Sequence, residues 1–338
     1  MLRKYTILIA LIALVFPVAF AQADAVDEVF CGDLTQSDCQ ILLDNAAVMD
    51  SLNSFAVSLS MRLEADSAEP MRVSAQANGQ FELDDESLQS IGEKAANMAE
   101  ADWGELAEIF LTSAKANLWI EMTDSSGEEE VKSEITLLLK DGILMLSAEA
   151  LSAMTGEDMT GMEGFGIDLN DAIGELLTES GAMPEADSAE MQEMEAVADT
   201  AMTIVRLPDS DVNGAAVAVF RTDFDLNAFF SLVSAEQIVA ASSDLDDPQT
   251  VSELMDSFEV GEFSVTQYIG LADSYTYGTD IAVDVSMSYM KDGQSQDSSI
   301  VLDMAALLSN FGEPVDVPIP EDAFIFPLAM LLQMGADS

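Results

Sequence analysis

Apolar and polar residues alternate with a period of two over long stretches of this chain. The pattern is clearest in residues 57–64, 71–83, 116–123 and 131–139, where about every second residue is apolar. This period places the apolar side chains of a β-strand on one face and leaves the other face in water. The first half therefore predicts about five antiparallel strands, including a short one after Lys140-Asp141-Gly142, because Asp-Gly between apolar alternations indicates a tight hairpin.

Strand periodicity returns in the second half of the chain. It predicts a hairpin from residues 203–207 and 215–222, a strand at 263–270, paired strands at 281–289 and 300–304, and a last strand within 309–324. That last segment contains three prolines, which lack the N–H that a central strand needs, so we expect an edge strand or a strand exit. The total is about ten or eleven strands.

Two other kinds of segment interrupt the strands. Apolar residues recur every three or four positions within residues 38–53, 85–113 and 225–258, which predicts helices. Thr35, Ser37 or Asp38 can cap the first helix. Residues 148–198 are rich in Met, Glu, Gly and Ala, and we expect a mobile connection there. The pattern predicts one α+β domain over residues 24–338, a single large antiparallel sheet whose apolar face the helices cover.

The first residues have the features of a secretory signal peptide. Arg3 and Lys4 precede an apolar run from Ile7 to Phe20, and small residues suited to cleavage follow up to Ala23. We expect residues 1–23 to direct export, which makes the protein periplasmic, extracellular or attached to the cell surface. An uncleaved N-terminal anchor is the alternative.

The two cysteines, Cys31 and Cys39, come shortly after this segment. Exported proteins meet an oxidising compartment, so we expect these cysteines to form a disulfide. A metal site is disfavoured because the chain has no histidine to complete it. Cys31 does not follow a lipobox, since Glu28, Val29 and Phe30 precede it, and lipid attachment is not expected.

The chain is strongly acidic, with 63 acidic and 11 basic residues and a net charge of −52. This charge excludes nucleic acid as a partner and favours basic protein partners. Solubility of an exported protein is the simpler interpretation. Transient contact with a membrane stays open, because charges are screened beyond about 8 Å at physiological salt. Hydrophobic residues make up 49% of the chain, enough for it to fold.

Catalytic chemistry is not indicated. The absence of histidine excludes Ser-His-Asp and Cys-His arrangements, and we expect neither an enzyme nor a cofactor. Asp209, Asp211 and Asn213 match the opening of an EF-hand calcium loop, but Phe220 stands where a bidentate Glu is required. A hairpin turn is the better interpretation of that stretch, and no metal site is predicted.

The last hundred residues carry a further motif, formed by Tyr268-Ile269, Asp273, Ser309, Phe311-Gly312, Pro314-Val315 and Pro320. It resembles the C-terminal strands of the LolA-like and LppX-type lipid- and lipoprotein-binding proteins, a superfamily of exported bacterial proteins. The resemblance implies an open, curved half-barrel whose concave apolar face is covered by helices and holds acyl chains. It implies a lipid or acylated ligand as the partner. LppX-type proteins usually carry a lipobox cysteine, which this chain lacks.

We therefore expect an exported, non-catalytic lipid-binding or lipoprotein-carrier-like protein with an apolar cavity between sheet and helices. The expected lining residues are the inward-facing positions Leu59, Met61, Phe81, Leu118, Ile120, Leu137, Val285 and Met287. The alternative is an acidic cell-surface structural or interaction module on the same fold. Such a module would have a filled core and would bind a basic partner or divalent cations.

Overall fold

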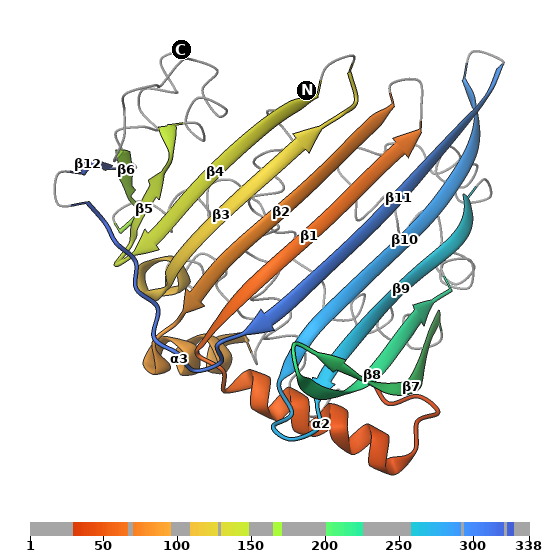
Figure 1. Cartoon of the computed structure of the whole chain (residues 1–338), viewed down its shortest axis with the longest axis horizontal. Coiled ribbons are helices and arrows are strands. Elements are labelled where there is room, and N and C mark those ends of the chain that lie inside the picture. Colours follow the sequence, from red (N-terminus) through yellow and green to blue (C-terminus); the bar gives the residue numbers. More distant parts are fainter. Residues whose placement is uncertain are drawn as a thin grey trace.

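The computed structural model describes residues 30–66, 70–95, 109–127, 130–148, 165–170, 201–225, 258–291, 294–320 and 323–327. These ranges contain helices α2 (Gln36–Asp50) and α3 (Asp85–Ala95) and one twelve-stranded sheet (Figure 1). The strands are β1 (Ser54–Asp66), β2 (Met71–Glu82), β3 (Lys115–Asp124), β4 (Val131–Lys140), β5 (Ile143–Leu146), β6 (Phe165–Asp168), β7 (Met202–Val212), β8 (Ala215–Phe224), β9 (Phe258–Gly270), β10 (Thr276–Lys291), β11 (Gln294–Ser309) and β12 (Phe324–Pro327).

The sheet consists of two meanders joined in its middle. Its strand order is β12-β6-β5-β4-β3-β2-β1-β11-β10-β9-β8-β7, and the two meanders meet where β1 pairs with β11 (Figure 1). Within the described residues, β12 and β7 each pair on one side, so the sheet is open rather than closed. The predicted open sheet is confirmed, with one or two more strands than the alternation indicated.

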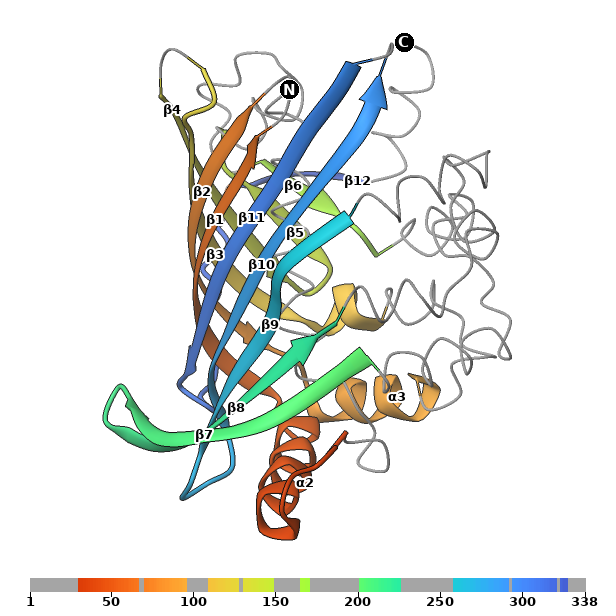
Figure 2. The same ribbon diagram turned by 90° about the vertical axis from the view of Figure 1, so that its right-hand side faces the viewer.

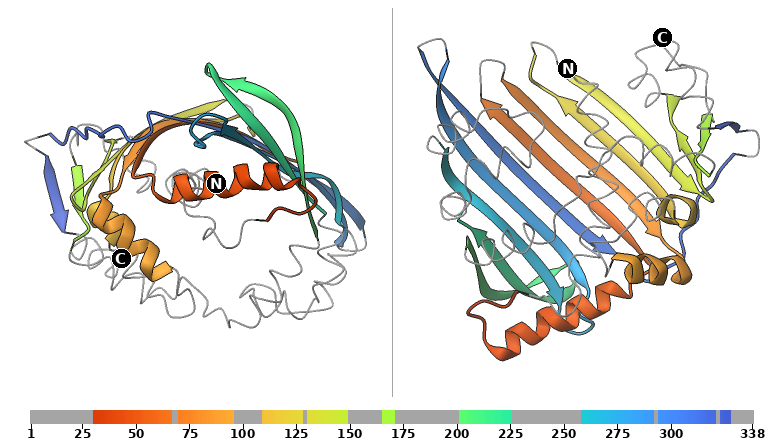
Figure 3. Two further views of the ribbon diagram at one scale, coloured as in Figure 1. Left: turned by 90° about the horizontal axis from the view of Figure 1, so that it is seen from below. Right: turned by 180° about the vertical axis from the view of Figure 1, so that it is seen from behind.

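The sheet is curved, and both helices lie on its concave side (Figures 2 and 3). Met49 of α2, Leu52 just after it and Ile91 of α3 are buried in one core with the apolar residues of β1 to β4. The apolar face is therefore the concave face, and the polar face is convex. Helical cover of the apolar face is confirmed for α2 and α3, whereas the predicted helix at 225–258 lies almost entirely outside the described residues.

The start of α2 is fixed by a cap and a disulfide. Thr35 Oγ1 accepts a hydrogen bond from the Asp38 N–H at 3.2 Å, which satisfies one of the free amides of the first turn. Cys31 and Cys39 form a disulfide that ties the preceding loop to the helix. The predicted disulfide is confirmed, and Thr35 is the cap among the three candidates.

The middle of α2 is attached to the turn between β9 and β10. The buried Asn45 amide donates to the Ser274 carbonyl at 2.7 Å and to Thr276 Oγ1 at 3.0 Å. Leu42, about one turn earlier, belongs to a buried cluster with Ile269 of β9. Leaving a buried amide without partners costs about 1–3 kcal/mol, so these bonds favour one position of α2 on the sheet.

Two-residue turns close the hairpins that the sequence predicts. Asp141-Gly142 joins β4 to β5, and Asn213-Gly214 joins β7 to β8. All four residues have positive φ angles between 53° and 88°, as the type I′ hairpin turn requires. The turn at Asp292-Gly293 lies outside the described residues.

The EF-hand-like stretch is a hairpin turn. The Asp211 carboxylate accepts a hydrogen bond from the Gly214 N–H at 2.8 Å, and Asp209 forms an ion pair with Arg206. Both carboxylates thus form contacts within the β7–β8 hairpin. Across the described ranges, no group of three or more His, Cys, Asp and Glu side chains is arranged to hold a metal ion.

Of the two interpretations of residues 309–324, the edge strand is wrong, whereas the strand exit agrees with the end of β11 at Ser309. Residues 313–320 form no ladder, and the last strand is β12, which pairs in parallel with β6. The segment leads from the end of β11, in the middle of the sheet, past α3 to the edge formed by β12 (Figure 1). Val315 and Val317 are buried, and the Val315 N–H donates to Glu82 Oε2 at 2.6 Å. Val315 and Val317 alternate with exposed residues because one side of this extended segment is buried. Its prolines lack the N–H that a ladder needs, so no ladder forms there.

Strand β6 lies inside the connection predicted at residues 148–198. It has only four residues, as does β12, and so short a stretch gives no clear alternation. Most of that connection lies outside the described residues, as do the expected signal peptide at 1–23 and residues 96–108 of the helical insert.

Gly79 of β2 leaves the space that Leu118 of β3 occupies. A Cβ on Gly79 would lie 2.8 Å from Leu118 Cδ1 and 3.3 Å from the Asn117 carbonyl oxygen. Leu118 is fully buried, so its side chain cannot turn into solvent to make room. We expect Gly79→Ala to lower the free energy of unfolding by about 1–3 kcal/mol, measured by urea denaturation.

Shortening the neighbour provides the control. Gly79→Ala combined with Leu118→Val should cost less than the sum of the two single substitutions, because the shorter side chain frees part of the space. Strictly additive losses would contradict the close contact between these two positions.

Candidate functional site

The concave face is built from transverse rows of apolar side chains. One row crosses five neighbouring strands and contains Ile135, Ile120, Ala77, Leu59 and Ala306. The next row contains Met122, Ala75, Met61, Met304 and Ile281. Apolar side chains adjoin one another along both rows, and polar residues stand at the row ends, Thr279 on β10 and Ser133 on β4.

Burial decreases from one end of this face to the other. At the end near α2 and α3, here named the packed end, Leu118 and Ile120 are 0% and 1% exposed. At the other end, here named the open end, Leu63 is half-buried, Ile300 is 38% exposed and Val131 is 48% exposed. The packed end is the lower end of the sheet in Figure 1, and the open end is the upper one.

The eight residues predicted to line a cavity fall into two groups along this gradient. The five in the packed core are Leu59, Phe81, Leu118, Ile120 and Leu137. Met61 is half-buried beside that core, and Val285 is half-buried on β10 opposite Ile300. Met287 lies two positions farther along β10, opposite Ser298. The structure thus brings five of them together in the packed core and places Met61 against that core, while Val285 and Met287 lie toward the open end.

The C-terminal motif residues gather at the packed end. Phe311 stacks on Tyr275 with the ring centroids 4.4 Å apart, and the Tyr277 hydroxyl donates to Asp273 Oδ2 at 2.8 Å. Gly312, at φ 70°, donates its N–H at 2.9 Å to the first residue of β1. The motif therefore joins the β9–β10 turn, the end of β11 and the start of β1. Its role in this arrangement is structural.

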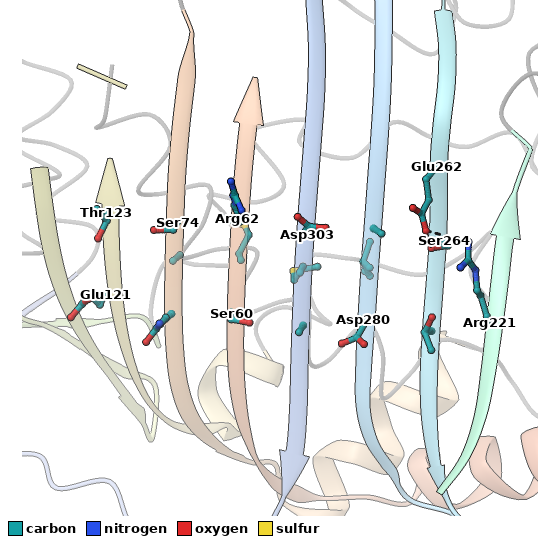
Figure 4. Close-up of a pocket in the computed structure, with 18 residues that line it drawn as sticks. Ser60, Arg62, Ser74, Glu121, Thr123, Arg221, Glu262, Ser264, Asp280 and Asp303 are labelled. Atoms are coloured by element: carbon teal, nitrogen blue, oxygen red, sulfur yellow. Dashed lines mark hydrogen bonds and ion pairs between the residues drawn. The ribbon is translucent and has the colours of Figure 1, made fainter. Parts of the chain in front are cut away.

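The convex face has a polar hollow of about 600 Å³, here named the polar groove (Figure 4). Two transverse rows of outward side chains line it. The first row runs from β3 to β8 as Glu121, Gln76, Ser60, Ala305, Asp280, Thr266 and Arg221. The second row contains Thr123, Ser74, Arg62, Asp303, Ala282 and Ser264.

Nothing in the sequence pattern predicted the polar groove. Small and charged residues at outward positions of seven strands form this site only once the strand order and register bring them together. The tip of the β7–β8 hairpin projects beyond the convex face of the sheet (Figures 2 and 3).

Tyr268 of β9 borders the polar groove, and its hydroxyl donates to Asp280 Oδ2 at 2.6 Å. This hydrogen bond, together with partial burial and the carboxylate's negative charge, raises the pKa of Tyr268 to about 12. A tyrosinate there would lose the bond and face a like charge. Asp280 is thereby fixed at the middle of the groove.

No helix in the described ranges is long and apolar enough to cross a membrane. No family model matches the chain, and no curated protein matches it either.

Solved structures give weak likenesses. The chain is similar to the lipoprotein LppX of Mycobacterium tuberculosis, with 9% identity and a TM-score of 0.32 over 82% of this chain and 97% of that one. It is similar to LprF of Mycobacterium bovis, with 13% identity and a TM-score of 0.34 over 84% and 96% of the two chains. A LolA-superfamily protein of Nitrosomonas europaea has 10% identity and a TM-score of 0.15 over 84% and 98%.

The raised pKa of Tyr268 predicts that the folded protein loses stability at strongly alkaline pH. An unfolded tyrosine has a pKa of about 10, below the folded value. The stabilisation is therefore complete below about pH 10 and is lost as the pH rises toward about 12. We expect ultraviolet absorbance to show one tyrosine ionising near pH 12 in the folded protein, and Tyr268→Phe to remove that step.

Near-ultraviolet circular dichroism over the same pH range shows whether the protein is still folded at each point. If Tyr268→Phe instead removes a step near pH 10, the hydrogen bond to Asp280 does not hold the proton.

Proposed function

We propose that this protein is an exported, non-catalytic lipid-binding protein of the carrier type, which holds acyl chains against the concave face of its sheet. The observation that carries this proposal is the burial gradient on that face. The packed end is a solid core, whereas the open end keeps apolar side chains half-buried or exposed. An apolar surface suits acyl chains, since each buried methylene contributes about 0.8 kcal/mol.

The side chains between the two ends support the proposal. Met61 and Met304 lie opposite each other on β1 and β11, and Met122 belongs to the same row. Methionine side chains are flexible and polarizable, so they adapt to ligands of varied shape. Farther along, the half-buried rings of Phe224 and Phe263 stack with centroids 4.8 Å apart. Such a surface accepts apolar chains without demanding one particular headgroup.

The direction of loading follows from the same gradient. Helices α2 and α3 close the packed end, and the Asn45 hydrogen bonds hold α2 on the sheet. An acyl chain would therefore enter at the open end, beside Ile300 and Val131. The ligand is a lipid or an acylated molecule, and binding involves no covalent step. Delivery or loading would involve a transient contact with a membrane or a basic protein.

One observation favours a second function, an acidic cell-surface structural or interaction module with a filled core. Five of the eight predicted lining residues lie in the packed core, where Leu118 occupies the space beside Gly79. In this case the concave face stabilises the fold, and binding takes place elsewhere.

Mass spectrometry of organic extracts tests the choice directly. We expect protein purified without detergent to release a lipid in an amount comparable to the protein, because exposed apolar surface at the open end binds acyl chains. If no lipid co-purifies and no fluorescent fatty acid binds, the lipid-binding function is wrong and the structural or interaction module is favoured.

A matched pair of variants locates the ligand on the concave face. Met61→Gln keeps the side-chain length but adds a polar amide to the half-buried middle of that face. We expect it to weaken binding of a fluorescent fatty acid several-fold. Ser58→Gln makes an exposed change on the convex face of the same strand and should leave the affinity unchanged. Equal effects of the two changes would place the ligand elsewhere.

A further inference from the structure

The polar groove on the convex face extends along two rows of side chains that cross the sheet from β3 to β8. Its floor consists of the small side chains of Ser60, Ala305, Ser74 and Ala282 on four adjacent strands. The rows cross β3, β2, β1, β11, β10, β9 and β8, which at about 4.8 Å per strand spacing gives roughly 29 Å. A peptide of about eight or nine extended residues, at about 3.3 Å each, has that length.

The charge of the groove is negative after its internal ion pairs are counted. Arg221 contacts Asp223 at 2.6 Å and Glu262 at 3.2 Å, and Arg62 forms an ion pair with Glu64. Both guanidinium groups that line the groove therefore already have carboxylate partners.

Three further carboxylates line the groove, those of Glu121, Asp280 and Asp303, and Asp303 lies opposite Arg62 of β1. Asp280 lies opposite Ala305, and Asp303 opposite Ala282, so the two aspartates are diagonal neighbours on β10 and β11. Diagonal neighbours in an antiparallel pair are about 7–8 Å apart, and the flanking alanines leave the space between them open. One ammonium or guanidinium group can contact both carboxylates at once.

An exposed apolar residue adjoins this pair. Leu307 on β11 points to the convex side and is 39% exposed. It follows Ala305 by two residues, so it lies next to the groove on the same face. The methylene stem of a lysine or arginine could pack on Leu307 while the charged group reaches the carboxylates.

We propose that the polar groove is a docking site for an extended, basic segment of a partner protein, with lysine or arginine side chains against Asp280 and Asp303. Charge complementarity and the length of the groove select this occupant. The negative field of the whole chain would speed the encounter. This site is independent of the concave face, so it does not rest on lipid binding.

Fluorescence anisotropy with a labelled nine-residue peptide of alternating arginine and serine tests the charge contribution. We expect Asp280→Asn with Asp303→Asn to weaken binding about tenfold or more, since close charge pairs at interfaces carry measurable coupling. The asparagine at 280 can still accept the Tyr268 hydrogen bond, which preserves the local fold. Asp33→Asn with Asp316→Asn removes the same net charge from exposed positions outside the groove and should change the affinity less than about twofold.

A second pair of variants tests the shape of the groove without changing its charge. Ala305→Phe fills the floor between Ser60 and Asp280 and should abolish most peptide binding. Ala216→Phe places the same ring on an exposed alanine of β8 outside the groove and should leave binding intact. Thermal unfolding checks that each variant is folded.

Two outcomes would overturn the proposal. Equal weakening by the two aspartate pairs means that the peptide responds only to the general negative field. Unchanged binding in Ala305→Phe means that the peptide lies elsewhere. Fatty-acid binding, measured on the same variants, should not change, which separates a failure of this site from a failure of the proposed lipid function.

Discussion

The structure depends on one constraint, the need to bury a single apolar face that runs the length of strands of up to sixteen residues. A slip of one residue in any pairing would move every apolar side chain of that strand into water. Register is therefore fixed at several places. The type I′ turns at Asp141-Gly142 and Asn213-Gly214 set two hairpins, and the Phe311 and Tyr275 rings hold β11 against the β9–β10 turn.

Helix α2 is central to this arrangement because it touches both halves of the sheet. Its Met49 belongs to the core of the β1–β4 meander, whereas its Leu42 belongs to the cluster formed with β7, β8 and β9. The two meanders are otherwise joined through the β1–β11 ladder. The disulfide and the Thr35 cap fix the start of α2, and Asn45 fixes its position on the sheet. Small local features near the N-terminus thus support a sheet that spans the whole chain.

The two faces of the curved sheet carry different side chains and suit different ligands. The concave face gathers apolar side chains, which are fully packed at one end and partly exposed at the other. The convex face spreads small and charged side chains over a hollow of about 600 Å³. An apolar ligand on one face and a basic segment on the other would not compete for space. Alternation along a strand decides which face a side chain takes, but it does not decide how deeply that side chain is buried. Leu118 and Ile120 lie in the solid core because α2 and α3 close that end.

The sequence by itself determined the strands, turns, helix cap and disulfide that depend on neighbouring residues. Alternation predicted the long strands, and Asp-Gly and Asn-Gly marked the tight turns. Thr35 was among the predicted caps of α2, and two cysteines after a predicted export signal indicated the disulfide. Tertiary structure decided what depends on distant partners. Strands β6 and β12 are too short to give a sequence signal; β6 forms between β5 and β12, and β12 pairs with β6. The proline-rich segment 313–320 leads to that edge without forming a ladder. The polar groove exists only because β1 pairs with β11, which brings Ser60 beside Ala305 and Arg62 beside Asp303. Residues more than two hundred positions apart meet there, and no periodicity within either strand specifies that pairing.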